Sequence, residues 1–142
     1  MNSQRNYQPS YSRLIRFFGI VSIAIFLITW AIDLTGLTYP CPYCRTQRTI
    51  IGILGLILLM TSRLHPLLTK YIVTVLGGYG FVVAAMQHFM GWDDIYEGVY
   101  KFGNGGPWFF DEMLLSGGAM FIIVAQVFTT LLLTTNCNKR PI

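Results

Sequence analysis

Charged residues divide this chain into four uncharged apolar runs, and this division constrains the fold more than any other feature. The runs cover residues 17–32, 49–62, 71–92 and 113–138. A membrane-spanning helix needs about 20 mostly apolar residues, which the third and fourth runs supply outright. The first run reaches that length by taking in Arg16 and Asp33, and the second only by extending back toward Cys44. We therefore expect spans at about residues 14–35, 43–63, 70–91 and 112–136.

The composition agrees with a lipid environment. The chain is 54% hydrophobic and 11% charged, whereas soluble proteins average roughly 25% charged residues. The net charge of +4 does not indicate a nucleic-acid partner, because most of the cations lie beside the ends of the apolar runs and not on one face of a soluble domain. The 142 residues are expected to form a single all-α integral membrane domain in a lipid bilayer.

Basic and acidic residues separate to opposite ends of the expected bundle. The N-terminal tail, the turn at 63–70 and the C-terminal Lys139-Arg140 carry cations, and all six acids lie at or beyond the other helix ends. Because cytoplasmic loops are rich in Lys and Arg, we expect an antiparallel four-helix transmembrane bundle with both termini cytoplasmic. Asp33 is expected to be a solvated flank of the first span, with an ion pair to Arg45 or Arg48 as the alternative. That span resembles a signal peptide but lacks a small-x-small cleavage site, so we expect it to remain as an anchor.

The second outer loop, about residues 91–111, is expected to contain a short amphipathic helix on the outer surface. Asp93 and Asp94 are candidate caps for it. Apolar residues then recur at roughly helical spacing, namely Ile95, Tyr96, Val99, Tyr100 and Phe102. The aromatic residues 108–110 follow at the depth of the membrane interface. Residues 95–110 therefore form a candidate surface for other membrane subunits.

Residues 40–48, with the sequence PCPYCRTQR, place two cysteines at the mouth of the second span. The prolines favour a helix that starts near residue 42 or 43. Cys41 would then lie at the helix N-terminus, where the partial positive charge stabilises a thiolate. Gln47 and Arg48 follow Cys44 at i+3 and i+4 and share its face. Because a cation within a span is a functional-site hypothesis by default, these four residues form a candidate redox site.

Other uses of the two cysteines fit less well. A structural zinc site needs four ligands, and only His88 is a further candidate on the outer side, so we expect no metal. Haem attachment requires a histidine directly after the second cysteine, where Arg45 stands. A permanent structural disulfide between Cys41 and Cys44 remains an alternative, although closing so short a loop gives little entropic stabilisation. The third cysteine, Cys137, lies at the opposite side of the expected bundle and is expected to be an inert thiol.

The topology and the motif resemble the DsbB family of membrane thiol–quinone oxidoreductases. The shared features are four spans, cytoplasmic termini, Cys-x-x-Cys at the start of the second span, and Gln47-Arg48 behind it. The resemblance implies a ubiquinone or menaquinone near the outer helix ends, held by Arg48 with Gln47 beside it, and close to His88. It implies that Cys44 faces the quinone and that Cys41 exchanges with other thiols.

The same resemblance implies a location and a partner. The location is the bacterial inner membrane, with the cysteine motif on the periplasmic side. The partner is a periplasmic thioredoxin-fold oxidase or another thiol protein. Family members typically carry a second cysteine pair in the second outer loop, whereas residues 91–111 contain no cysteine.

Two functions therefore stay open. The chain could be a thiol oxidoreductase that passes electrons from partner thiols through a Cys41–Cys44 disulfide to a quinone, with the partner attacking directly or a second protein supplying the missing pair. It could instead be a non-catalytic DsbB-like subunit that stabilises or assembles a larger membrane complex.

Overall fold

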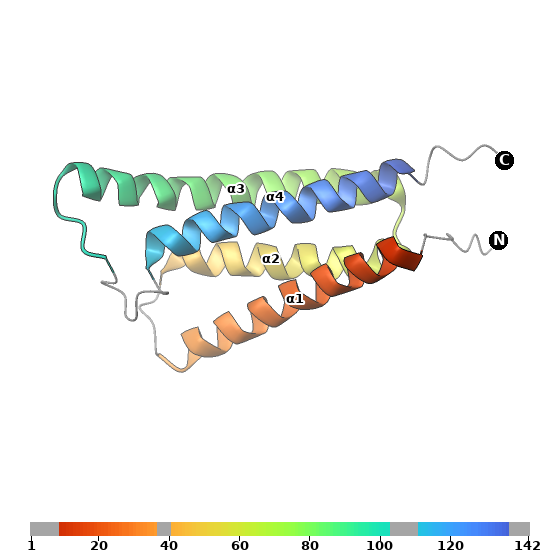
Figure 1. The fold of residues 1–142 in the computed structure, drawn as a ribbon, viewed down its shortest axis with the longest axis horizontal. Coiled ribbons are helices and arrows are strands. Elements are labelled where there is room, and N and C mark those ends of the chain that lie inside the picture. Colours follow the sequence, from red (N-terminus) through yellow and green to blue (C-terminus); the bar gives the residue numbers. More distant parts are fainter. Residues whose placement is uncertain (1–8, 37–40, 103–110, 137–142) are drawn as a thin grey trace.

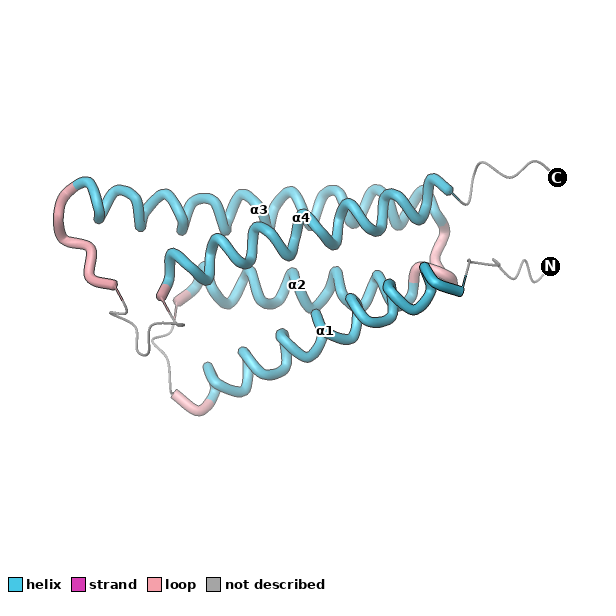
Figure 2. Tube along the Cα trace, viewed as in Figure 1, coloured by secondary structure: helices cyan, strands magenta, loops and turns pink. Residues whose placement is uncertain are grey.

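The computed structural model describes residues 9–36, 41–102 and 111–136. These residues form α1 (Pro9–Leu34), α2 (Pro42–Met60), α3 (Pro66–Tyr96) and α4 (Glu112–Asn136). Successive helices run antiparallel, and the start of α1 lies at the same end as the finish of α4 (Figure 1, Figure 2). All four helices are long and apolar enough to cross a membrane. The predicted all-α four-helix membrane bundle is confirmed.

Two prolines and one capping aspartate determine where α2, α3 and α4 begin. Pro42 and Pro66 lie in the first turns of α2 and α3, where the missing amide hydrogen costs little because the first amides of a helix have no intrahelical partner. Asp111 caps α4, since its Oδ1 accepts the backbone amides of Met113 at 3.1 Å and Leu114 at 3.3 Å. Local sequence therefore sets both outer helix starts, beside the cysteines and at α4.

The outer end of α3 differs from the prediction. Asp93 and Asp94, expected to cap a separate amphipathic helix, instead lie inside α3, which continues to Tyr96. Gly98, with φ +72°, ends the helix, and the amides of Gly98 and Val99 donate to carbonyls one turn back at 3.1 and 3.0 Å. The separate helix does not form within residues 91–102 because nothing between the apolar run and Gly98 forces the backbone out of helical geometry.

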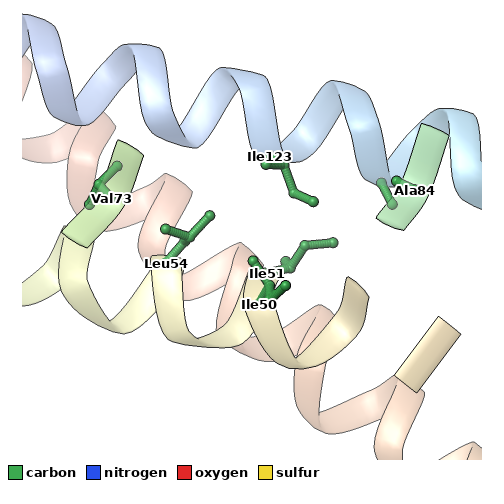
Figure 3. Close-up of a cluster of buried hydrophobic side chains, with 7 residues drawn as sticks. Ile50, Ile51, Leu54, Val73, Ala84 and Ile123 are labelled. Atoms are coloured by element: carbon green, nitrogen blue, oxygen red, sulfur yellow. The ribbon is translucent and has the colours of Figure 1, made fainter. Parts of the chain in front are cut away.

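The core is centred on α2, which packs against each of the other three helices. The buried cluster, most of it shown in Figure 3, consists of Ile50, Ile51, Leu54, Val73, Ala84, Ala119 and Ile123. Many large apolar residues face outward instead, such as Phe17, Phe89 and Phe121, each at least 65% exposed. An apolar exterior around a packed interior is what a lipid solvent favours.

A buried amide ties three helices together inside this core. Gln126 on α4 donates from Nε2 to Ser22 Oγ on α1 at 2.8 Å and to the Ile51 carbonyl oxygen on α2 at 3.0 Å. Such interhelical hydrogen bonds hold membrane helices together where hydrophobic burial adds little. The contact joins α1 to α4, two helices that otherwise meet mainly through α2.

Gly55→Ala is expected to destabilise the bundle by about 1–3 kcal/mol, as overpacking typically does. A Cβ atom at this position would lie 2.7 Å from Ser22 Cβ and 3.3 Å from the Gly19 carbonyl oxygen, so α1 would have to shift away from α2. Stability can be followed by circular dichroism during SDS titration of the protein in mild detergent. Gly78→Ala is the control, since nothing lies within 4 Å of a Cβ there. Equal stability of the two variants would contradict the close α1–α2 packing.

Candidate redox site

Cys41 stands immediately before the first turn of α2, as the proline pattern predicted. Its Sγ accepts the backbone amide of Cys44 at 3.3 Å, in the manner of a helix N-cap. Both cysteines are free thiols and half-buried. The amide donor and the positive end of the helix both favour negative charge on the Cys41 sulfur. This geometry suits Cys41 to thiol–disulfide exchange.

Gln87 on α3 touches both sulfurs. Its Nε2 lies 3.2 Å from Cys44 Sγ and 3.7 Å from Cys41 Sγ. Its Oε1 accepts Nε2 of Gln47 at 2.7 Å, which directs the Gln87 amide nitrogen toward the cysteines. Gln87 is 4% exposed, so water competes little for these contacts. Gln47 thus orients the Gln87 side chain so that its N–H group points at the two sulfurs.

Arg48 reaches from α2 to α1. Its Nε donates to the Cys44 carbonyl oxygen at 3.2 Å, and its Nη1 donates to the Thr29 carbonyl oxygen at 2.8 Å. The side chain is 14% exposed. Carbonyl acceptors on two helices lower the cost of holding a guanidinium within a span.

Asp33 balances this charge, and the prediction that it is a solvated flank is wrong. Its side chain is only 1% exposed, with Oδ2 2.7 Å from Arg45 Nε and Oδ1 3.7 Å from Arg48 Nη1. The prediction failed because α1 packs along α2 in a register that directs the carboxylate at two cations one turn apart. Among the described residues Oδ1 accepts no hydrogen bond, so it acts on Arg48 through charge.

A cavity of about 220 Å³ joins these groups. Four of the predicted site residues line it: Cys41, Cys44, Gln47 and Arg48. The remaining wall is mainly apolar and comes from α1, α2 and α4, including Ile32, Ile51, Leu115 and Ile122. The end of α1 nearest the cysteines diverges from the other helices (Figure 1). The cavity, which we call the inner cavity, thus combines two sulfurs, the cation of Arg48, the carboxylate of Glu112 and mostly apolar walls.

His88, the fifth predicted site residue, lies apart from the other four. Its Nδ1 is 3.2 Å from the Met113 carbonyl oxygen and 3.3 Å from Ser116 Oγ, both on α4. It lines a neighbouring hollow of about 400 Å³ and not the inner cavity. Consecutive helical residues point about 100° apart, so when α3 presents Gln87 to α2 it turns His88 toward α4.

The family match agrees with this arrangement. The family described as "Disulfide bond formation protein DsbB" matches residues 12–96, which is more than half of the chain and runs through α1, α2 and α3. The chain belongs to the DsbB family. Comparisons with curated proteins and with solved structures gave no match.

The DsbB assignment confirms the resemblance drawn from the motif and topology. Membership indicates a multi-pass membrane protein with disulfide-bond oxidoreductase function, which works in a lipid bilayer and with a thiol-protein partner. DsbB proteins use quinones. The matched region holds the Cys41–Arg48 motif and Gln87, whereas α4 lies beyond it. Cys137 and the aromatic residues 108–110 lie outside the described residues.

Gln87 is the site residue that the sequence reasoning missed. The available indication was its chemistry: an amide in an otherwise apolar span, at the same expected depth as the cysteines, needs a polar partner.

Gln87→Leu is expected to make the reduction potential of the cysteine pair more negative by about 20–30 mV. The variant removes a donor that stabilises reduced sulfur, a net effect of about 1–1.5 kcal/mol, and roughly 30 mV corresponds to 1.4 kcal/mol for a two-electron couple. Equilibration in glutathione buffers, followed by maleimide gel-shift, measures the potential. Met86→Leu, on the exposed face of α3, is the control. An unchanged potential in Gln87→Leu would contradict a functional contact with the sulfurs.

Proposed function

We propose that this protein is a membrane thiol oxidoreductase that passes electrons from partner thiols through a Cys41–Cys44 disulfide to a quinone. The observation that carries the proposal is the inner cavity, where both sulfurs and the mostly buried guanidinium of Arg48 line one space. A structural disulfide would need neither the cation nor the cavity.

Each cysteine has a distinct role in this proposal. A partner thiolate attacks Cys41 Sγ, and the Cys44 thiolate leaves as the disulfide opens. The helix N-terminus and the Gln87 amide stabilise negative charge on the pair. Because residues 91–111 contain no cysteine, the partner, a thioredoxin-fold oxidase or another thiol protein, reaches Cys41 without a relay inside this chain.

The inner cavity fits a quinone head group. A quinone is a flat, largely apolar ring with two carbonyl oxygens, and it supplies a lipid-soluble acceptor for two electrons. The apolar wall residues suit the ring, while Arg48 and Gln47 supply donors for its oxygens. Ubiquinone and menaquinone share these features. No quinone contact is assigned to His88, because its ring faces α4 outside this cavity.

We further propose a bacterial inner-membrane location with the cysteine motif on the periplasmic side. Arg13, Arg16, Arg63 and Lys70 lie at the end of the bundle opposite the cysteines, and Asp93, Asp94 and Glu112 lie at the cysteine end. The positive-inside rule favours a cytoplasmic position for the first of these ends.

The direct test is quinone reduction by a dithiol. The protein is purified in lipid nanodiscs from a Cys137→Ser background, so that only the cysteine pair can react. Dithiothreitol with a soluble ubiquinone or menaquinone analogue should give protein-dependent loss of quinone absorbance. Alkylation of the reduced pair with N-ethylmaleimide should abolish that loss. Turnover that survives alkylation, or no turnover by a protein whose pair is oxidised and reducible, would exclude the oxidoreductase proposal.

A further inference from the structure

A second hollow, of about 430 Å³, lies on the other side of Cys41. We call it the outer hollow. It is formed by the last turns of α3, the loop at residues 99–101 and the start of α4. Of these two spaces in the described part of the chain, Cys41 lines both, whereas Cys44 lines the inner cavity but not the outer hollow. The two sulfurs therefore differ in their surroundings, because Cys41 borders the outer hollow and Cys44 does not.

Hydrogen bonds hold the wall of the outer hollow in place. The Tyr100 hydroxyl group donates to the Asp111 carboxylate, lying 2.7 Å from each oxygen. Desolvation, and then the bond to Asp111, raise the pKa of Tyr100 to about 12. The hydroxyl group therefore stays protonated and continues to donate at physiological pH. Asp111 also caps α4, so the loop is fastened to a helix end and the hollow is preformed.

The charges around the outer hollow are unequal. Three carboxylates line it, from Asp94, Asp111 and Glu112, against one ammonium group, from Lys101. Asp94 is exposed on the last turns of α3. An excess of negative charge around a reactive sulfur attracts cations and repels anions, including thiolates without a compensating positive charge.

We propose that the outer hollow is the docking site for a cysteine-bearing segment of a partner protein, with basic residues next to the attacking cysteine. The inference rests on the proposed function and adds the site and the charge of the substrate segment. The segment must come from another protein, because residues 91–111 have no cysteine. Basic neighbours offset the repulsion between the carboxylates and the incoming thiolate.

The exchange balances without any further reactant. A partner thiolate attacks Cys41 Sγ, the Cys41–Cys44 bond breaks, and a mixed disulfide with Cys41 forms as Cys44 leaves as a thiolate. A second partner thiolate attacks the partner sulfur of that mixed disulfide and releases Cys41. The partner loses two electrons and two protons and gains a disulfide, and the Cys41–Cys44 pair becomes a dithiol.

The test compares attack by small thiols of opposite charge. Cys137→Ser protein is oxidised with diamide in detergent, without quinone, and maleimide gel-shift follows reduction of the pair by cysteamine, a cationic thiol, and by 2-mercaptoethanesulfonate, an anionic one. The oxidised peptide of residues 40–48, with Arg45→Gln and Arg48→Gln so that it lacks the two charges that Asp33 balances in the protein, gives the intrinsic rate ratio of the two thiols. At low ionic strength the ratio for the protein should favour cysteamine by about tenfold over the peptide, because one charge about 6 Å away in water changes the rate of each thiol about threefold and in opposite directions.

Substitutions of single charged residues test whether the preference for cysteamine comes from the outer hollow. Asp94→Asn should reduce the preference by about tenfold and Lys101→Gln should increase it by a similar factor. Glu97→Gln is the matched control, because Glu97 is an exposed acid directly after α3 that does not line the outer hollow. A ratio equal to that of the peptide, or an equal response of Asp94→Asn and Glu97→Gln, would overturn the proposal. This assay contains no quinone, so its outcome does not depend on whether the protein reduces quinone. Failure of the docking proposal and failure of the proposed function can therefore be told apart.

Discussion

Cys44→Ala is expected to lower dithiol-driven quinone reduction to the uncatalysed rate while the bundle stays folded. Without Cys44 the pair cannot form a disulfide, so partner electrons have no route to the inner cavity that Cys44 lines. Cys44 is half-buried and packs at the start of α2, and its replacement by a smaller apolar residue should cost little stability. Quinone absorbance reports activity, and circular dichroism reports folding.

Trapping separates the roles of the two cysteines. In the Cys137→Ser background, a thiol protein with a single reactive cysteine is activated as a mixed disulfide with a nitrothiobenzoate leaving group. Cys44→Ala should then form a stable cross-link to it through Cys41. Cys41→Ala should cross-link at least about tenfold more slowly, because Cys44 does not line the outer hollow. Quinone reduction that persists in Cys44→Ala, or equal cross-linking of both variants, would exclude the assigned order of electron transfer.

Asp33→Ala is expected to destabilise the bundle by about 3 kcal/mol, the low end of the range of roughly 3–5 kcal/mol for removing one partner of a buried ion pair. The change leaves Arg48 without its counter-charge while its carbonyl acceptors on Thr29 and Cys44 remain. The low end applies because Arg45 is 45% exposed and stays hydrated when unpaired. SDS titration in mild detergent measures the loss.

Asp93→Ala provides the comparison, since Asp93 is an exposed acid near the outer end of α3. It should change stability by less than about 0.5 kcal/mol, as surface substitutions usually do. Asp33→Asn keeps the shape and removes the charge, so it should fall between the two. An Asp33→Ala protein as stable as Asp93→Ala would show that the carboxylate does not hold the two arginines.

The number, approximate limits and class of the helices follow from the sequence because hydropathy is a property of single segments. The start of α2 beside Cys41 follows for the same reason, since Pro42 acts on its own backbone. The limit of α3 was harder to predict, because polar residues past the apolar run allow a helix to continue as readily as to stop. Gly98 decides that end through its positive φ.

The contacts of the site depend on tertiary register, which a single sequence does not encode locally. Asp33 meets Arg45 and Arg48 only because α1 lies along α2 at one particular height. Gln87 and His88 are adjacent, and which of them faces the sulfurs depends on the rotation of α3 about its axis. The motif therefore predicted the α2 half of the site, while the residues contributed by α1 and α3 required the packed structure.

The unequal lengths of α2 and α3 connect the chemistry to bilayer thickness. At 1.5 Å per residue, the 19 residues of α2 measure about 28 Å and the 31 residues of α3 about 46 Å. A hydrocarbon layer of about 30 Å matches the length of α2, with the cysteines at its boundary, and is shorter than α3. Lipids with longer acyl chains would submerge the sulfurs while the outer tip of α3 stayed hydrated. Thicker membranes would thus hinder the reaction of the cysteines with the partner thiol protein, which comes from water. They would favour the reaction with the quinone, which is dissolved in the lipid.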